Sequence, residues 1–179
     1  EQFAMERRAA LCLMRMGRRE EARMTARAAL DAAPPDLPSV ELARCLLVAG
    51  TAALELGNFP GARVDAAAIL DALGEESELE ETAMAMNLLG AVGFRSGEPE
   101  AAREHWERAL EIYRKRGDLG HLAGSYVNLG NLHKLRCDWD RSAEHYHVAY
   151  YLGTTRGEYG LVAGAAQNLG IVLGKTGRY

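Results

Sequence analysis

The sequence predicts an all-α fold in which antiparallel helix hairpins repeat every 40 residues. Two glycine series with this spacing carry the prediction: Gly50, Gly90, Gly130 and Gly170, and then Gly17, Gly57, Gly97 and Gly177. The composition agrees with it. The 48% of apolar residues is rich in alanine, a strong helix former, and poor in the β-branched residues that favour sheets. We therefore expect a solenoid of about four and a half hairpins.

Three further columns of residues keep the same period: Ala22, Ala62, Ala102 and Ser142; Leu30, Leu70, Leu110 and Tyr150; Ala9, Ala49, Leu89, Leu129 and Leu169. We expect one solenoid domain over residues 1–179, with units at about 1–36, 37–76, 77–117 and 118–156 and a partial unit at 157–179. The chain begins at Glu1 without a methionine and ends at Tyr179 inside a unit. It is therefore expected to be a fragment of a longer protein.

Proline and polar residues mark the boundaries between the predicted units. Pro34, Pro35 and Pro38 cannot continue a helix, so they delimit the loop after the first unit, with Asp36 as a candidate cap. In the next loop, Ser77 and Glu80 have the spacing of a capping box, which predicts a helix start near Leu79. Asp118 is the candidate cap of the fourth unit.

The fourth unit has the clearest pattern of two helices and a turn. The first helix is predicted at Leu119–Leu135, because its apolar residues recur at three- and four-residue spacing, and the second at about Asp140–Tyr151. The turn contains Cys137, where other units have a glycine that ends a helix with a positive φ. Mid-helix Gly130 predicts a close approach of the two helices, against Ser142. Trp106 and Tyr146 are predicted to be buried in their own hairpins.

These residues resemble the tetratricopeptide repeat. In the fourth unit the resemblance is carried by Asn128-Leu129-Gly130-Asn131-Leu132, Trp139, Ser142, Tyr146 and Ala149, and in the third by Leu89-Gly90, Gly97, Ala102, Trp106 and Ala109. The resemblance implies a right-handed superhelix whose first helices line a concave groove for a peptide or a partner helix. The period exceeds the family's usual repeat of about 34 residues. Such long units resemble the superhelical arms of bacterial signalling and transcriptional regulators.

The family geometry also implies which residues face the groove. The predicted peptide-binding residues are Asn87, Phe94, Arg95, Val127, Asn131, Lys134, Gln167 and Lys175, with Ala91, Leu135 and Ile171 beside them and Arg15 and Glu55 extending the row. Side-chain amides hydrogen-bond both backbone donors and acceptors of an extended peptide. Arg95, Lys134 and Lys175 would favour an acidic segment. The alternative is that all of these are ordinary solvated helix residues.

No catalytic, cofactor-binding or metal-binding residue is predicted, and the chain is not expected to be an enzyme. Gly170–Thr176 ends like a phosphate-binding loop, but Leu169 stands where the first glycine is required. His105 and His145 are one period apart, so we expect surface or boundary positions for the five histidines, His105, His121, His133, His145 and His147. Cys12, Cys45 and Cys137 lack disulfide or zinc spacing and are expected to be buried free thiols.

The net charge and the hydropathy of the chain limit the classes of partner that it can bind. The net charge of −4 argues against nucleic-acid binding, and no apolar run is long enough to cross a membrane, so we expect a cytoplasmic protein. The acidic residues between Arg63 and Arg95 are expected to form a solvated loop and helix start: Asp65, Asp71, Glu75, Glu76, Glu78, Glu80 and Glu81.

Two functions remain open. The first is a scaffold that binds a protein or peptide in the concave groove. The alternative is a self-assembly or regulatory arm of a larger bacterial signalling protein, forming a homo-oligomer through its terminal helices. The last predicted helix, about Leu161–Lys175, supports the alternative, because it is expected to expose Leu161, Val162, Ile171, Val172 and Leu173.

Overall fold

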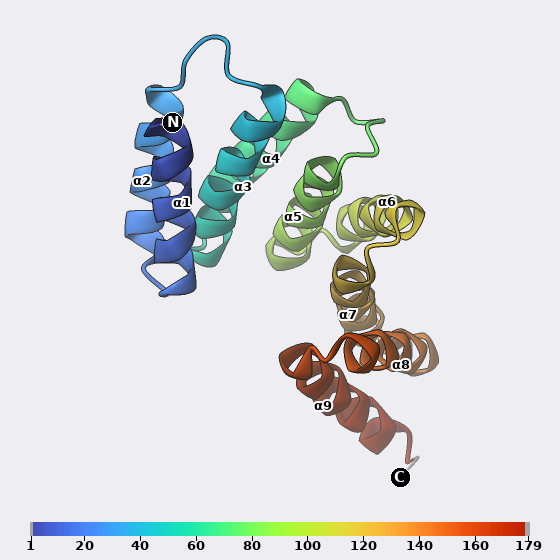
Figure 1. Ribbon diagram of the computed structural model, residues 1–179. Helices are drawn as coiled ribbons and strands as arrows, with labels where there is room; N and C mark the ends of the chain where they lie inside the picture. The colour runs from blue at the N-terminus through green and yellow to red at the C-terminus, as the bar shows by residue number, and fades with distance from the viewer. Residues whose placement is uncertain (1, 178–179) are drawn as a thin grey trace. The chain divides into compact units, whose positions relative to one another are not determined.

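The computed structural model describes residues 2–177, and in this range the chain forms nine α-helices and no strand (Figure 1). The helices are α1 (Gln2–Arg15), α2 (Arg19–Asp31), α3 (Ser39–Glu55), α4 (Phe59–Leu73), α5 (Glu80–Ser96), α6 (Pro99–Arg116), α7 (Leu119–Leu135), α8 (Trp139–Arg156) and α9 (Tyr159–Thr176). Consecutive helices are joined by short turns and loops. The predicted all-α solenoid of helix hairpins is confirmed.

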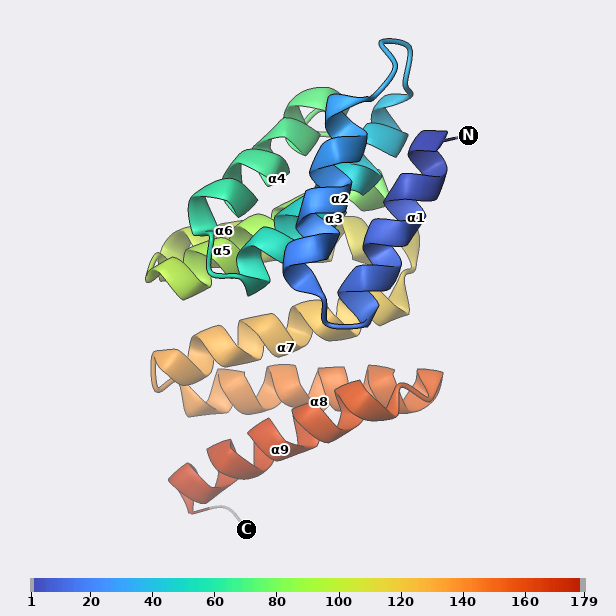
Figure 2. The same cartoon turned by 90° about the vertical axis from the view of Figure 1, so that its left-hand side faces the viewer.

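The described residues fall into two compact units, of which unit 1 ends at Glu98 and unit 2 begins at Pro99. In unit 1, α3 packs against α1, α2, α4 and α5. In unit 2, α7 packs against α6, α8 and α9, and the last three helices lie side by side (Figure 2). The single domain over residues 1–179 and its repeat boundaries stay a prediction, and Glu1 and Tyr179 lie outside the described residues.

The turns within the hairpins have the backbone conformation that the glycine series predicts. Gly17, Gly57, Gly97 and Gly177 have φ of 75°, 77°, 80° and 69°. A side chain with a Cβ rarely adopts this left-handed conformation, so these four glycines are required by the turns. Cys137 replaces glycine in the fourth unit and still has φ of 57°.

Close approach of neighbouring helices explains the mid-helix glycines Gly50 and Gly130, whereas Gly170 has nothing within 4 Å of a built Cβ. A Cβ built on Gly130 would lie 2.7 Å from Cε1 of Tyr146, and one on Gly50 would lie 2.7 Å from Cδ2 of Leu88. The Ser142 hydroxyl donates a hydrogen bond of 2.9 Å to the Gly130 carbonyl, which confirms the predicted neighbour. Trp106 and Tyr146 are 2% and 0% exposed, as predicted.

Two of the three predicted caps do not form, although the predicted helix start near Leu79 is confirmed. The side chain of Asp118 accepts the His121 N–H at 3.1 Å and caps α7, as expected. By contrast, Leu79 is the N-cap of α5 and has extended backbone, while Ser77 accepts only the Leu79 N–H at 3.3 Å. Pro38 occupies the N-cap of α3, so Asp36 does not cap it.

The predicted helix ends hold for α7 and, within two residues, for α9, but the predicted end of α8 is wrong. α8 continues five residues past Tyr151 to Arg156, because Gly157, with φ of 70°, is the residue that ends it. The expected exposure of the α9 apolar residues is also wrong in part. Val172 is 0% exposed, and Leu161, Val162 and Leu173 are half-buried, whereas Ile171 is 47% exposed. The reason is that α8 covers one face of α9, with Gly153 leaving room for Leu161 and Val162.

Candidate functional site

A groove of about 280 Å³ lies in unit 1 and is lined by the first helices of three successive hairpins, α1, α3 and α5. Its apolar lining consists of Leu11, Met14, Leu47, Val48 and Met84, and its polar lining of Arg7, Arg44, Thr51, Glu80 and Glu81. The apolar side chains supply the larger part of the lining. The groove thus offers an apolar surface with charged groups beside it, as protein-binding clefts usually do.

Helical spacing brings these residues to one surface. On α1 the lining residues Arg7, Leu11 and Met14 are four and three residues apart, and on α3 the lining residues from Arg44 to Thr51 repeat the same pattern. The first helices of successive hairpins run in the same direction. Because the charged residues come earlier in each helix than the apolar ones, the charges gather toward one end of the groove.

Ion pairs tie the charged end together across the three helices. Arg7 lies 3.3 Å from the Glu41 carboxylate, and Arg44 donates from Nη1 to Glu41 and from Nε to Glu81, both at 2.8 Å. The hydrogen bond that Arg44 donates to Glu81 and the charge of that carboxylate raise the pKa of Arg44. Glu81 is only 6% exposed. The prediction that it is a solvated residue is therefore wrong, because it faces Arg44 rather than water.

Five of the ten groove residues occupy repeat positions predicted from the family geometry: Arg7, Leu11, Met14, Leu47 and Thr51. Arg7 and Leu47 stand one period apart, in the column that continues to Asn87, Val127 and Gln167. Leu11 and Thr51 likewise precede Asn131 in its column. The predicted row includes Arg15 in α1 and Glu55 in α3 but lacks the groove residues Arg7, Leu11, Leu47 and Thr51. Extending the columns by one and two periods toward the N-terminus would have found them.

The predicted residues of α5 make contacts with the preceding hairpin. Asn87, Ala91 and Phe94 are half-buried, whereas Arg95 is exposed. Arg95 donates from Nη1 to the Leu54 carbonyl at 2.8 Å, and its guanidinium lies 5.3 Å from the centroid of the Phe59 ring. Arg15 and Glu55, which extend the row, are exposed, and Glu55 is paired with Arg19.

In unit 2 the predicted residues of α7 bind neighbouring side chains. The Tyr146 hydroxyl donates to Oδ1 of Asn131, and Nζ of Lys134 donates to Oδ1 of Asn168 on α9, both at 2.7 Å. The Lys134 ammonium also lies 5.7 Å from the Tyr146 ring centroid. Val127 is half-buried, and the exposed members of the row are Leu135, Gln167, Ile171 and Lys175. Of the three cations predicted to attract an acidic segment, two therefore hydrogen-bond within their own unit.

One histidine of unit 2, His133, is less exposed than predicted, whereas the half-buried His145 agrees with a boundary position. His133 is 9% exposed, and its ring stacks on that of His145 with centroids 5.1 Å apart, so its predicted surface or boundary position is wrong. Nδ1 of His133 lies 3.2 Å from Oδ2 of Asp138. Burial, followed by the charge of His133, lowers the pKa of His145.

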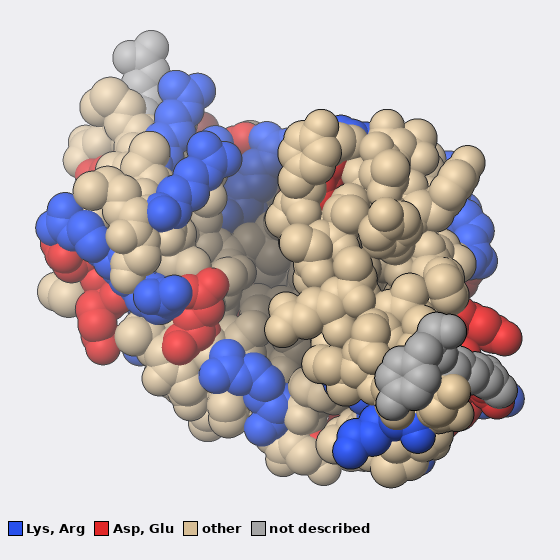
Figure 3. Space-filling model, turned by 90° about the horizontal axis from the view of Figure 1, so that it is seen from below, with Lys and Arg blue, Asp and Glu red and all other residues tan. Residues whose placement is uncertain are grey.

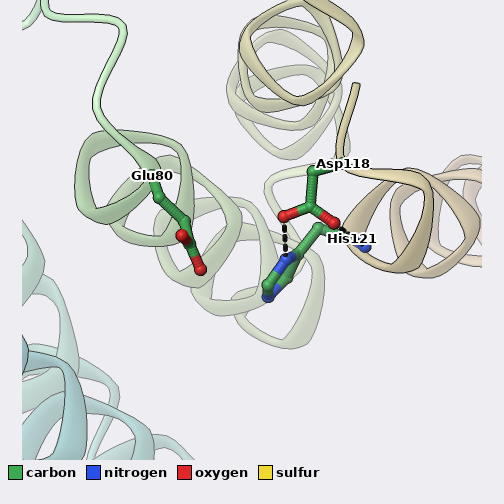
Figure 4. A group of neighbouring side chains, drawn as sticks. All are labelled: Glu80, Asp118 and His121. Atoms are coloured by element: carbon green, nitrogen blue, oxygen red, sulfur yellow. Dashed lines mark hydrogen bonds and ion pairs between the residues drawn. The ribbon is translucent and has the colours of Figure 1, made fainter. Parts of the chain in front are cut away.

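The start of α7 holds a second histidine–carboxylate pair (Figure 4). Nδ1 of His121 lies 2.7 Å from Oδ2 of Asp118, while the other carboxylate oxygen caps the helix. Burial alone would raise the pKa of Asp118, but the hydrogen bonds from the His121 side chain and backbone hold this pKa below its usual value. These contacts account for both residues as parts of a helix cap.

Two further expectations about buried groups are wrong. Asp65 is 1% exposed rather than solvated, since it lies on α4 close to Gly50 and pairs with Arg27. Burial raises the pKa of Asp65 against the opposing effect of Arg27. Among the cysteines only Cys45 is buried, and burial raises its pKa to about 11. Cys12 and Cys137 are exposed, because the first lies on an uncovered face of α1 and the second in a turn.

The surface charge is mixed. On the face seen in Figure 3, basic and acidic side chains lie next to one another, and the basic atoms form no continuous field. A continuous basic field is what a phosphate backbone requires. Among the helices that the structure describes, none combines the length and the apolar character needed to cross a bilayer.

Comparisons with known proteins agree with the hairpin architecture. The tetratricopeptide repeat model matches residues 81–150. BtubC from P. vanneervenii superposes with a TM-score of 0.79 at 20% identity, over 94% of this chain and 70% of that one. The apo form of RapI superposes with a TM-score of 0.84 at 16% identity, over 100% of this chain and 65% of that one. MamA superposes with a TM-score of 0.58 at 20% identity, over 98% and 92% of the two chains.

No curated protein sequence matches the chain. At these identities the solved structures establish the fold. The resemblance seen in the sequence is confirmed: residues 81–150 belong to the tetratricopeptide repeat family, and the chain has the fold of its helical-hairpin solenoids.

Proposed function

We propose that this chain is a scaffold that binds a partner protein or peptide in the row formed by the first helices of its hairpins, and that it is not itself an enzyme. The observation that carries the proposal is the groove between α1, α3 and α5. Helical-hairpin repeats commonly present such elongated concave surfaces to other proteins. The free thiols of Cys12, Cys45 and Cys137 support a reducing, cytoplasmic setting.

The chemistry of the groove supports binding of a polypeptide. Leu11, Met14 and Met84 provide an apolar surface whose removal from water by a partner side chain is favourable. Thr51 adds a hydroxyl that both donates and accepts hydrogen bonds. In unit 2, Gln167 and Lys175 are exposed on α9 and belong to the row predicted from the family geometry, so they form a separate candidate surface of that unit.

Blocking the groove tests this proposal. We expect Leu11→Arg to abolish binding of partner proteins, because Leu11 lines the groove and is 36% exposed, so the long cation would occupy the apolar part of the groove. Met24→Arg is the matched control, since Met24 is 70% exposed on α2 and lies outside the groove. The double variant Asn131→Ala and Lys134→Ala tests the row in unit 2. Quantitative pull-down with each folded variant measures how much partner protein it captures. If the groove variant and the double variant capture as much as the control and the unmodified chain, groove binding is refuted.

A second function, self-assembly or a regulatory arm of a larger bacterial signalling protein, is favoured by the outer face of α1. Met5 is 64% exposed and Met16 66%, with Ala9 and Cys12 exposed between them. One period later, Cys45, Ala49 and Ala52 are all 0% exposed. The difference arises because α2 packs on that face of α3. A further helix covering α1 in the same way would complete this surface.

A further inference from the structure

The face of α1 that neither α2 nor α3 covers is a surface separate from the groove. We propose that this outer face binds an acidic amphipathic helix of a partner protein. The face consists of exposed residues only: Met5, Arg8, Ala9, Cys12, Arg15 and Met16. The inference rests on the second candidate function, since both use this face, but its occupant is a partner helix rather than a second copy. It does not depend on binding in the groove.

The apolar part of the outer face is a stripe along the helix. Met5, Ala9, Cys12 and Met16 follow one another at spacings of four, three and four residues, which places them on one side of an α-helix. Met5 and Met16 are 64% and 66% exposed. The small residues in the middle of the stripe let a second helix approach closely, and the flexible methionines at its ends adapt to that helix.

The next hairpin shows how a helix covers this face. One period later the stripe contains Cys45 and Ala49, which are 0% exposed because α2 packs on them. The Cys45 thiol donates to the Ala26 carbonyl at 3.6 Å, and Arg19, the first residue of α2, pairs with Glu55 at the end of α3. The covering helix is therefore antiparallel to α3. A helix that covered α1 in the same way would begin beside the last turn of α1.

The charges beside the stripe are positive. Arg8 and Arg15 are exposed, lie seven residues or about two helical turns apart, and form no ion pair with any other described residue. Glu6, the one acidic residue within Gln2–Arg15, is half-buried and accepts a hydrogen bond from Gln2 at 2.9 Å. Part of the Arg15 charge stabilises the C-terminal end of α1. A covering helix would still meet two cations on this face.

The positions of the two arginines determine the charges that the covering helix needs. Arg15 has the repeat position of Glu55, which pairs with the first residue of its covering helix. A carboxylate in the first turn of the partner helix would therefore face Arg15, and the helix dipole favours a carboxylate there. A second carboxylate about two turns later would face Arg8.

The second helices of this chain lack that charge. None of their first residues is acidic: Arg19, Phe59, Pro99 and Trp139. A second copy would therefore place no carboxylate opposite Arg15 if one of these helices covered α1. A partner helix with glutamates beside an apolar stripe complements the outer face in both charge and hydropathy.

Three helical peptides of equal length test the proposal. All carry the same apolar stripe of alanine and leucine, and two residues beside it, seven apart, are glutamates in the first, glutamines in the second and lysines in the third. Binding to the full chain is measured by fluorescence anisotropy. We expect the glutamate peptide to bind about threefold more tightly than the glutamine peptide and about tenfold more tightly than the lysine peptide at low salt. Both differences should decrease as salt screens the charges.

Variants of the chain locate the binding site. Arg8→Gln combined with Arg15→Gln should remove the preference for glutamate, whereas Arg8→Lys combined with Arg15→Lys should retain it. Met5→Gln combined with Met16→Gln should weaken all three peptides about tenfold, because both side chains are exposed on the stripe. Met84→Gln, in the groove, is the matched control and should change nothing. Helical circular dichroism verifies that each variant is folded.

The possible failures are distinguishable. Equal binding of the glutamate and lysine peptides overturns the inference. Loss of binding in Met84→Gln also overturns it, because the peptide would then lie in the groove, and this result supports groove binding instead. If no peptide binds, the inference fails. Self-assembly still stands in that case if light scattering shows an association that Met5→Glu combined with Met16→Glu removes.

Discussion

Gly130 shows how one residue controls the packing of a hairpin. A Cβ there would lie 2.7 Å from Cε1 and 2.8 Å from Cδ1 of Tyr146, a fully buried ring held by the Asn131 hydrogen bond. We predict that Gly130→Leu lowers the free energy of unfolding by about 1–3 kcal/mol or more through overpacking. Gly170→Leu, at the same repeat position but with nothing within 4 Å of its Cβ, should cost nothing. Urea unfolding of both variants compares them, and equal stabilities would contradict the packing described for Gly130.

His145 makes the stability of unit 2 depend on pH. Tyr126 and His133 face its ring from α7, and Asp138, Arg141 and Glu144 surround it from the turn and α8. Its pKa is lowered mainly by burial. The unfolded chain therefore protonates His145 near pH 6.5, whereas the folded chain protonates it only at a lower pH. This contribution to stability is complete above the unfolded pKa and declines as the pH falls through it toward the lower folded pKa.

The test is the slope of unfolding free energy against pH. We predict that His145→Gln reduces this slope between about pH 7.5 and pH 5, a window chosen around the unfolded value. His147→Gln is the matched control, because His147 is exposed on the same helix. A slope that survives unchanged in His145→Gln would show that another group is responsible.

At the scale of the helix, the turn between α7 and α8 retains strain that the other hairpin turns avoid. Cys137 has φ of 57°, whereas Gly17, Gly57 and Gly97 occupy the equivalent position in the earlier hairpins. The left-handed conformation costs an L-residue with a Cβ about 1 kcal/mol more than glycine. We predict that Cys137→Gly raises the free energy of unfolding by about that amount, and that Gly97→Ala lowers it similarly. Thermal melts under reducing conditions give the comparison, and a lower melting temperature for Cys137→Gly would contradict the assignment of strain.

At the scale of the whole molecule, the terminal helices determine whether copies of the chain associate. Met5 and Met16 expose on α1 a face that α2 covers on α3, and Ile171 is 47% exposed on α9. If these faces associate, light scattering should show an apparent mass that rises with protein concentration. The double variant Met5→Glu and Met16→Glu should remain at the monomer mass, with Met24→Glu behaving as the unmodified chain. A monomer at every concentration would exclude association through these helices.

Local physics explains why much of the fold was predictable from the sequence. The 40-residue spacing of the glycines identified the hairpins, because left-handed turns and close helix contacts both exclude a Cβ. The same spacing indicated which residues of successive first helices occupy equivalent positions on the predicted groove. The cap at Asp118 was also predictable, since the side chain needs only the backbone three residues later.

Tertiary packing determined what the sequence pattern could not. Ser77 has the spacing of a capping box and marked the helix start near Leu79 correctly, yet its side chain accepts only the Leu79 N–H and Leu79 itself is the N-cap of α5. His133, Asp65 and Glu81 are polar residues whose burial depends on His145, Arg27 and Arg44, partners that lie 12, 38 and 37 residues away in the sequence. The groove itself depends on the side chains that three separate helices bring together. A repeat gives equivalent backbone positions, but the side chains at those positions decide that Leu47 and Met84 line an open groove whereas Asn131 and Lys134 bind their neighbours.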